Sequence, residues 1–312
     1  MRFKTTVSVL LFTGLMAGCS PTEAPSGQDR ATEMQQFESQ AGKISIPKEL
    51  SRITVLDTNS LNTIQTLGAS DKVVALPQGT PLPTALQQFN SQAYINVGTA
   101  KEPNLEKIAE SRPQLILMSG RMENLMAQIQ GIAPVYFNQV DYTDRLNSFR
   151  QHTLNIADMV GKRAEAEQQL TTLSKDIKAL QEKTKDKTAL MILVNNNKLS
   201  AYGVGSRFGL IHDLYGFQPA DPNIKVGTHG MSVSHEFIAE KNPDYLFVID
   251  RSAAITEGDG GARKVLDNNL VRQTKAAKNG HIVFLDSSTW YLINDSLGGM
   301  QSMLKEVDEV VK

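Results

Sequence analysis

The chain has 312 residues, enough for two domains of ordinary size, and its 40% hydrophobic and 21% charged residues are typical of a globular protein. Its formal net charge of -1 excludes the strongly basic surface that nucleic-acid-binding domains present. Any attraction for an anionic ligand must therefore come from local clusters of arginine.

The first 18 residues have the pattern of a secretory signal peptide. Arg2 and Lys4 precede an apolar run, residues 7–17, that is too short to cross a bilayer comfortably. The run leads through small residues to Cys19, the one cysteine in the chain, and this stretch resembles a bacterial lipobox. We expect cleavage after residue 18 and lipidation of Cys19, although a leftover free thiol is the alternative.

Residues 19–44 are predicted to form a flexible tether. They are rich in Ser, Thr, Gln, Glu and Pro and contain few large apolar side chains. Such a segment cannot bury enough apolar surface to offset the entropy lost on folding. A tether would keep the folded part of the protein close to the membrane.

An internal repeat predicts two similar lobes. Residues 104–121 read NLEKIAESRPQLILMSGR, and residues 234–251 read SHEFIAEKNPDYLFVIDR. Each copy reads as a short helix, a proline and a buried strand that ends at an arginine, Arg121 or Arg251. Chance similarity between two ordinary helix–strand units remains the alternative.

Strands and helices alternate on either side of the repeat, which predicts parallel sheets in α/β lobes. The first lobe is expected to contain a strand at 53–57, a helix at 61–67 and a short strand near Val73. The second is expected to contain a strand at 189–195, a helix at 208–215 and a loop through Gly227.

The predicted architecture is two Rossmann-like lobes with a ligand cleft between them. We expect an N-terminal lobe at 45–142, a long interlobe helix at 143–163 and a C-terminal lobe at 164–312. The helical pattern continues to about Lys183, and Gly161 is expected to break it. Ligands of α/β sheets bind beyond the carboxyl ends of the strands, where the two repeat arginines would face each other.

Four further residues are candidate ligand contacts. Arg207 lies in a glycine-rich turn at 203–209 that is also a weak dinucleotide-binding pattern with imperfect spacing. His229 lies in a Gly-Thr-His-Gly loop, and Trp290 and Tyr291 follow a strand predicted at 282–286. Taken singly, such a histidine is more often an ordinary surface or core residue, and such a tyrosine more often packs.

Together these residues resemble the cleft of class III periplasmic binding proteins, in particular the branch that binds ferric catecholate siderophores for ABC importers. The resemblance covers essentially the whole mature chain and includes EPNLEKIAESRPQLIL, residues 102–117. It implies that Arg121, Arg207 and Arg251 cradle an anionic iron–catecholate. It also implies that His229 and Tyr291 complete the coordination of iron, with Trp290 as a neighbouring contact.

The chemistry of ferric iron agrees with this assignment. Fe(III) is a hard ion that prefers oxygen donors and accepts imidazole. A siderophore with two catecholates supplies four oxygens and leaves two octahedral positions, which one imidazole and one phenolate would fill. The iron would arrive as part of the siderophore complex, and we expect no intrinsic cofactor.

Two glutamates at equivalent positions of the repeat have a separate interpretation. Glu106 and Glu236 fall in the first turn of their predicted helices, where acidic residues are favourable in any protein. The resemblance implies that they meet arginines on the paired permease subunits, with Glu102 as a neighbouring candidate. We expect a monomer that is lipid-anchored in the periplasm, or on the extracytoplasmic face of the cell membrane in a single-membrane bacterium, and the near-neutral net charge predicts that it binds no nucleic acid.

Other classes of function are weighed against this one. The five histidines include no His-Glu-x-x-His pair, and the chain has no nucleophile elbow or phosphate-binding loop, so an enzyme is disfavoured. A free-metal site would need three or four clustered His, Asp or Glu side chains. A haem- or corrinoid-binding protein of the same fold is the nearer alternative, with His229 and Tyr291 as axial ligands.

Overall fold

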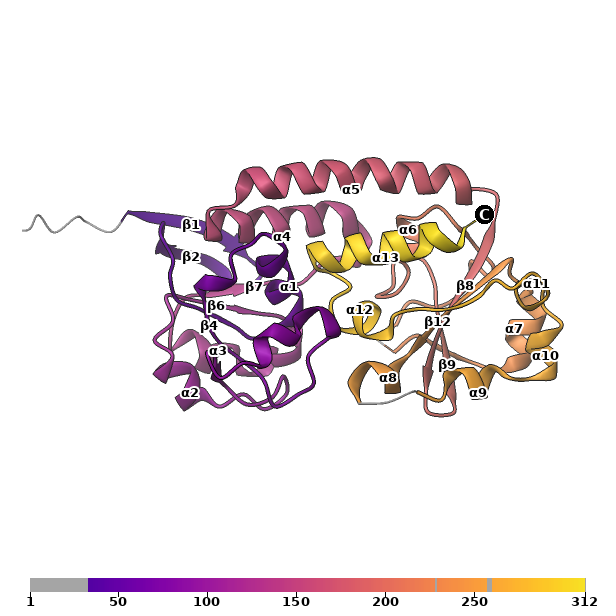
Figure 1. Ribbon diagram of the computed structural model, residues 1–312, viewed down its shortest axis with the longest axis horizontal. Coiled ribbons are helices and arrows are strands. Elements are labelled where there is room, and N and C mark those ends of the chain that lie inside the picture. The colour runs from indigo at the N-terminus through magenta and orange to yellow at the C-terminus, as the bar shows by residue number, and fades with distance from the viewer. Residues whose placement is uncertain (1–32, 228, 257–259, 312) are drawn as a thin grey trace, which may run out of the picture. The chain divides into compact units, whose positions relative to one another are not determined.

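The structure is a computed structural model that describes residues 33–227, 229–256 and 260–311. Cys19, the predicted signal peptide and the first part of the predicted tether lie outside these residues. Within them, two lobes each contain a β-sheet flanked by helices (Figure 1). The α/β fold with two lobes is as the sequence predicts.

The N-terminal lobe contains five parallel strands in the order β5-β4-β3-β6-β7. Its strands are β3 (Ile53–Val55), β4 (Val73–Leu76), β5 (Ile95–Asn96), β6 (Leu115–Met118) and β7 (Val135–Phe137). Its helices are α1 (Thr58–Thr66), η1 (Ser70–Lys72), η2 (Thr84–Asn90), α2 (Leu105–Glu110), η3 (Gly120–Leu125) and α3 (Met126–Gln130). The central strands β3 and β6 are buried along their whole length, because helices or loops cover both faces of a parallel sheet.

The C-terminal lobe has a mixed sheet, in the order β11-β9-β8-β12-β13, with β10 also paired to β8. Its strands are β8 (Thr188–Asn195), β9 (Lys198–Tyr202), β10 (Gln218–Pro219), β11 (Met231–Val233), β12 (Tyr245–Asp250) and β13 (Ile282–Phe284). Its helices are α6 (Leu210–Asp213), α7 (His235–Lys241), α8 (Arg251–Ile255), α9 (Ala262–Leu266), α10 (Asn269–Arg272), α11 (Lys275–Lys278) and α12 (Ser287–Leu292).

The expectation of a purely parallel second sheet is wrong at one edge. A tight turn containing Asn196, whose φ is 54°, sends β9 back antiparallel to β8, and β11 then pairs antiparallel to β9. The loop predicted through Gly227 therefore leads into an edge strand. The helix predicted at 208–215 is reduced to the single turn of α6.

The repeat is real at the level of backbone geometry. In both copies a side-chain oxygen caps the helix, with Asn104 accepting from the amide of Lys107 and Ser234 from that of Phe237. Both helices end at a left-handed residue at the same repeat position, Arg112 at φ 46° and Asn242 at φ 41°. Each helix then leads into the central strand next to the first strand of its lobe.

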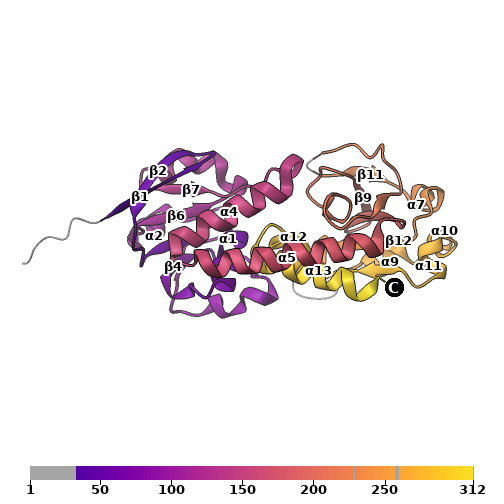
Figure 2. The ribbon, with the colours of Figure 1, turned by 90° about the horizontal axis from the view of Figure 1, so that it is seen from above.

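The lobes are joined by a helical hairpin rather than by one helix at 143–163. After η4 (Tyr142–Asp144), α4 (Arg145–Val160) ends at Gly161, and α5 (Arg163–Thr184) runs antiparallel to it into β8 (Figure 2). Gly161 adopts φ 72°, a conformation that glycine accepts without strain and that ends many helices. The predicted break at Gly161 is correct, but the boundary at residue 163 separates the two helices and not a helix from a lobe.

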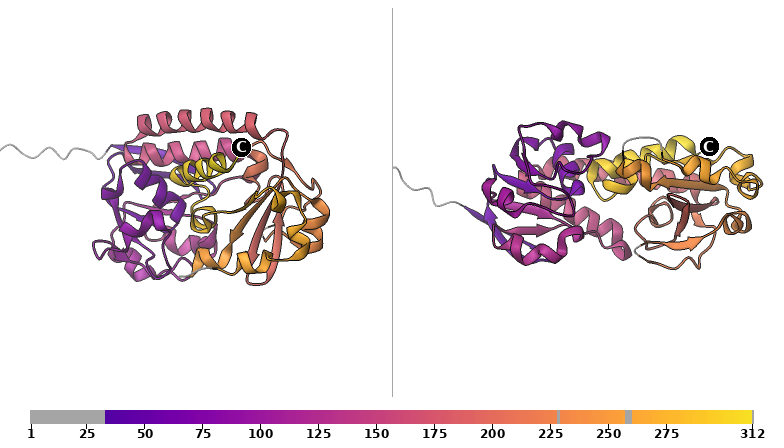
Figure 3. Two further views of the ribbon diagram at one scale, coloured as in Figure 1. Left: turned by 45° about the vertical axis from the view of Figure 1, so that its right-hand side comes forward. Right: turned by 90° about the horizontal axis from the view of Figure 1, so that it is seen from below.

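The C-terminal segment returns to the N-terminal lobe. Helix α13 (Leu297–Val310) begins beside α1 and runs along α5 (Figures 1 and 3). Asn62 of α1, only 4% exposed, accepts hydrogen bonds from the Ser296 hydroxyl and the Gly299 amide, at 2.8 and 3.1 Å. The C-terminal lobe is therefore fastened to α1 directly as well as through the hairpin.

The predicted tether extends too far. Residues that it was expected to include form the hairpin of β1 (Met34–Ser39) and β2 (Gly42–Pro47). Alternating side chains, among them Phe37 and Ile44, pack against the core, while the polar residues between them explain why composition suggested a tether. No helix in the described part of the chain is long and apolar enough to span a membrane.

Candidate functional site

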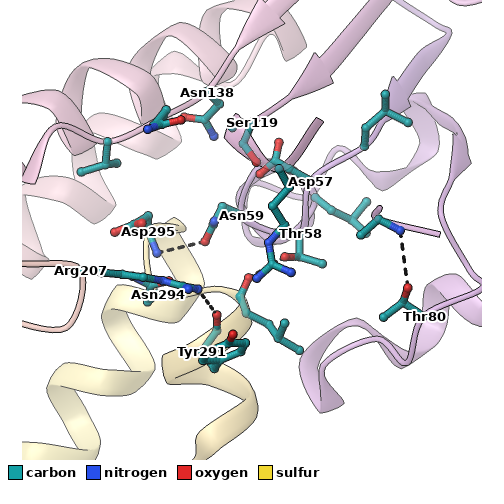
Figure 4. Close-up of a pocket in the computed structure, with 18 of the residues that line it drawn as sticks. Asp57, Thr58, Asn59, Thr80, Ser119, Asn138, Arg207, Tyr291, Asn294 and Asp295 are labelled. Atoms are coloured by element: carbon teal, nitrogen blue, oxygen red, sulfur yellow. Dashed lines mark hydrogen bonds between the residues drawn. The ribbon is translucent and has the colours of Figure 1, made fainter. Parts of the chain in front are cut away.

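A cavity of about 620 Å³ opens between the two sheets, beyond the carboxyl ends of their strands. The N-terminal lobe contributes Asp57, Ser119 and Arg121 to its lining, and the C-terminal lobe contributes Arg207 and His229. Figure 4 shows Asp57, Ser119 and Asn138 on one side and Arg207, Tyr291 and Asp295 on the other. Residues far apart in the sequence therefore share one site.

The repeat arginines occupy the predicted strand ends. Arg121 follows β6 as the second residue of η3, and Arg251 follows β12 as the first residue of α8. Arg121 lines the cavity, whereas Arg251 lies behind Tyr291 and is not part of the lining. The Nε atom of Arg251 donates to the Tyr291 hydroxyl at 3.0 Å, and its Nη1 atom donates to Asn195 at 3.3 Å.

Arg207 also contacts Tyr291. Its Nη2 atom donates to the main-chain carbonyl of Tyr291. Its guanidinium carbon lies 4.7 Å from the centre of the Tyr291 ring and 4.8 Å from that of Phe208. The guanidinium group is therefore held by a hydrogen bond and by two aromatic faces while it lines the cavity.

The charges around Tyr291 favour its ionised form. Burial alone would raise the pKa of the Tyr291 phenol, but the hydrogen bond from Arg251 and the charges of Arg207, Arg251 and Arg121 outweigh it and lower that pKa. The guanidinium carbons of Arg121 and Arg251 lie 6.0 and 5.8 Å from the ring centre. None of the ion pairs found among the described residues involves any of these arginines.

His229 also lines the cavity, from the loop that precedes β11. Its side chain is exposed, and the following Gly230 has a φ of 71°. The structure therefore brings the predicted imidazole and the predicted phenol to one cavity. Within the described ranges, no three side chains of His, Cys, Asp or Glu are grouped as a metal site.

Trp290 does not contact the cavity, contrary to expectation. It is 0% exposed, and its indole nitrogen donates to Glu306 of α13 at 2.7 Å. Successive residues of a helix point about 100° apart, so Tyr291 faces the cavity while Trp290 packs into the core. The prediction relied on sequence adjacency and took no account of the short helix α12.

The sequence prediction did not identify Asp57, Ser119 and Asn138, polar residues of the N-terminal lobe that line the cavity. Asp57 caps α1 by accepting from the Ser60 amide at 2.9 Å, and its second carboxylate oxygen is buried with no hydrogen-bond partner among the residues that the structure describes. Burial raises the pKa of Asp57, although hydrogen bonds and the charge of Arg121 act in the opposite direction. Asp57 and Asn138 both follow strands of the sheet, so the strand-end rule that selected Arg121 could have found them.

Glu106 and Glu236 lie away from the cavity. Each is the exposed second residue of its helix, α2 or α7. Glu102 is exposed in the loop before α2. The repeat thus presents accessible carboxylates at equivalent positions of the two lobes, Glu106 with Glu236 near the start of each helix and Glu110 with Glu240 near its end.

Comparisons with known proteins agree with this architecture. A family model described as "Periplasmic binding protein" matches residues 53–289. The petrobactin-binding protein YclQ of Bacillus subtilis is 38% identical over 314 residues, which cover 99% of this chain and 98% of that protein. Its crystal structure superposes with a TM-score of 0.86 over 90% of this chain and 99% of that one.

Two further proteins are similar over most of their length. The ferric-anguibactin-binding protein FatB of Vibrio anguillarum is 28% identical over 305 residues, 95% of this chain and 93% of its own. The periplasmic catecholate-siderophore binding protein VctP of Vibrio cholerae has a crystal structure that is 26% identical, with a TM-score of 0.82 over 89% of this chain and 100% of that one. Because the matched segment 53–289 contains every strand of both lobes, the chain belongs to the periplasmic binding protein family.

Proposed function

We propose that this protein captures a ferric catecholate siderophore between its lobes and delivers it to the permease of an ABC importer. One observation carries the proposal: three guanidinium groups surround Tyr291 at a cavity that His229 also lines. The similar proteins YclQ, FatB and VctP, whose names describe siderophore binding, support the same class of ligand.

The iron complex would be held by its charge and by its unfilled coordination positions. A ferric complex with two catecholates carries one negative charge, and a complex with three carries three. Arginine binds adjacent phenolate oxygens through paired, charge-assisted hydrogen bonds and stacks on aromatic rings. With two catecholates, His229 and Tyr291 fill the remaining two positions on iron, and Tyr291 binds as phenolate and releases a proton when it starts as phenol.

We further propose that the protein is anchored by a lipid on Cys19 in the periplasmic space. Glu106 and Glu236 would then dock on the two permease subunits, with Glu102 as a neighbouring contact. Two exposed carboxylates at equivalent repeat positions match a partner with two-fold symmetry.

The buried indole of Trp290 provides a test that needs no label. Trp290 is the only tryptophan of the chain and adjoins Tyr291 in α12, so a coloured ferric complex in the cavity would quench its fluorescence by energy transfer. We expect ferric bis-catecholates and tris-catecholates to quench at submicromolar concentration, and ferric hydroxamates to require higher concentrations. Haem binding more tightly than every catecholate, or no quenching by any of the complexes, would refute the proposed function.

A further inference from the structure

Arg145 is a buried charged residue that neither the repeat nor the resemblance identifies. It is the first residue of α4 and is only 3% exposed. It does not line the cavity, but Tyr142, Ser206 and Asp295, which it contacts, all do. Arg145 therefore lies directly behind the wall of the cavity that carries Arg207.

Its guanidinium group holds the loop that positions Arg207. The Nη2 atom of Arg145 donates to the carbonyl oxygens of Ser206 and Arg207, at 2.6 and 2.9 Å. Asp213 supports the same loop, since its carboxylate accepts from the Gly205 amide at 3.0 Å and lies 3.7 Å from the Nε atom of Arg145. Two consecutive carbonyl groups of the loop are thus fixed from behind by one side chain.

The other side of the guanidinium group is anchored to the segment before α13. Its Nη1 atom lies 3.1 Å from the carboxylate of Asp295, which also accepts from the Tyr142 hydroxyl at 3.0 Å. The amide of Asp295 donates to Asn59 of α1 at 3.0 Å, as Figure 4 shows. The Tyr142 ring covers the guanidinium group, with 4.4 Å between its centre and the guanidinium carbon.

This arrangement has a geometric consequence for the ligand site. Arg207 extends from the loop to the carbonyl of Tyr291, so its direction depends on where its own backbone is held. The planar fork of arginine can reach two carbonyl oxygens and a carboxylate simultaneously, which lysine cannot do. We infer that Arg145 is a positioning residue, which aims Arg207 at the anionic ligand by joining the loop at 203–209 to α4 and to the segment before α13.

The first test uses the ligand-free protein and is independent of the proposed function. Hydrogen–deuterium exchange of residues 203–209 should accelerate at least tenfold in Arg145→Gln and less in Arg145→Lys, because lysine retains the charge but reaches fewer partners. Arg150→Gln is the matched control, since Arg150 is an exposed arginine of the same helix. If exchange in the loop is unchanged in both Arg145 variants, the inference is wrong.

The lysine variant also guards against loss of folding. Arg145→Gln leaves two partly buried carboxylates, Asp213 and Asp295, without their cation, and burial raises the pKa of each. Arg145→Lys preserves the charge balance and is expected to fold. Thermal unfolding of both variants separates a general loss of stability from a local change in the loop.

The second test rests on the proposed function and measures coupling between the two arginines. We expect Arg207→Gln to weaken binding of a ferric tris-catecholate by about ten- to a hundredfold, and Arg145→Lys by several-fold to about tenfold. If Arg145 acts through Arg207, the double variant binds within about twofold of Arg207→Gln alone. Losses that multiply would overturn the inference.

Ligands of different charge provide the specific signature. Misplacing the Arg207 guanidinium weakens binding of a complex with three negative charges more than binding of a complex with one. The affinity for the tris-catecholate divided by that for the bis-catecholate should therefore fall in Arg145→Lys, as we expect it to fall in Arg207→Gln. A purely structural defect would weaken both complexes equally, which would contradict the inference. A wild-type protein that binds neither complex would refute the proposed function, while the exchange experiment would still decide the role of Arg145.

Discussion

Arginines from both lobes lie close to the Tyr291 side chain. Arg251 donates to its hydroxyl and Arg207 to its carbonyl, while Arg121 contributes charge from the other lobe. A phenol surrounded by three cations is suited to binding a hard metal ion as phenolate.

The lowered pKa of Tyr291 can be measured directly. A spectrophotometric titration at the absorbance of tyrosinate should show one phenol that ionises below the ordinary pKa of about 10, whereas burial raises the pKa of Tyr136 to about 12. The early step should disappear in Tyr291→Phe and move to higher pH in Arg251→Gln. An early step that persists in Tyr291→Phe would show that another group is responsible.

The lowered pKa of Tyr291 also determines in which direction the free energy of unfolding changes with pH. Because the native state releases this proton at a lower pH than the unfolded chain, the ionisation adds stability as the pH rises from the native pKa of Tyr291 towards about 10. That contribution is lost again as the pH falls through the native pKa. Its removal in Tyr291→Phe should flatten the dependence of unfolding free energy on pH in this window.

The sequence could predict some residues of the site and not others. Arg121 and Arg251 were found because a repeat and the strand-end rule are local signals. His229, Arg207 and Tyr291 were assigned through the family resemblance, since nothing in their flanks shows that they share a cavity. Arg145 could not be found, because the groups it holds are 61 to 150 residues away along the chain.

At the scale of elements, the repeat contributes Arg121 and Arg251 to the surroundings of Tyr291, and Glu106 and Glu236 to the candidate docking surface. The sequence predicted α2–β6 and α7–β12 from the matching glutamate, Ala-Glu, proline and arginine positions of the two copies, with chance similarity as the alternative. The structure adds that helix capping, a left-handed residue and a buried strand recur in the same order. The antiparallel strands β9 and β11 were missed because their pairing depends on a turn at Asn196 and on contacts distant in sequence. The strands β1 and β2 were missed because their exposed residues dominate their composition.

Charge reversal on the repeat helices tests the docking proposal. Glu106→Arg combined with Glu236→Arg should leave ligand affinity unchanged, because both residues are exposed and outside the cavity. It should abolish most of the stimulation of the importer's ATPase in proteoliposomes, because like charges would then face each other. Glu110→Arg with Glu240→Arg is the matched control on the same helices, and an equal effect of both pairs would argue against a specific contact.

At the scale of the whole molecule, several contacts hold the two lobes together. The hairpin of α4 and α5 spans them, Arg145 joins α4 to the C-terminal lobe, and the start of α13 is bonded to α1. This many contacts favours small relative movements of the lobes over wide opening. The sequence predicted a rigid helical connection but gave no sign that the C-terminal helix returns to α1.

A substitution at Asn62 tests how much the contact between α1 and the start of α13 contributes to stability. In Asn62→Ala, the Ser296 hydroxyl and the Gly299 amide each lose one acceptor in a buried position. We expect the free energy of unfolding to fall by about 1–3 kcal/mol. Chemical denaturation provides the measurement, with Asn90→Ala at an exposed position as control; equal stability of the two variants would show that the contact is unimportant.

The central claim is that guanidinium groups from both lobes jointly hold an anionic iron chelate. Its most direct test is the affinity of Arg121→Ala, Arg207→Ala and Arg251→Ala for a ferric bis-catecholate, followed by quenching of Trp290 and compared with Arg150→Ala. Arg121→Ala and Arg207→Ala, at residues that line the cavity, should each lose roughly 1.5–3 kcal/mol of binding free energy, or about one to two decades in Kd. Arg251→Ala should also weaken binding, through the loss of its hydrogen bond and charge at the Tyr291 phenol, while the control retains wild-type affinity. Wild-type affinity in all three variants would contradict the claim.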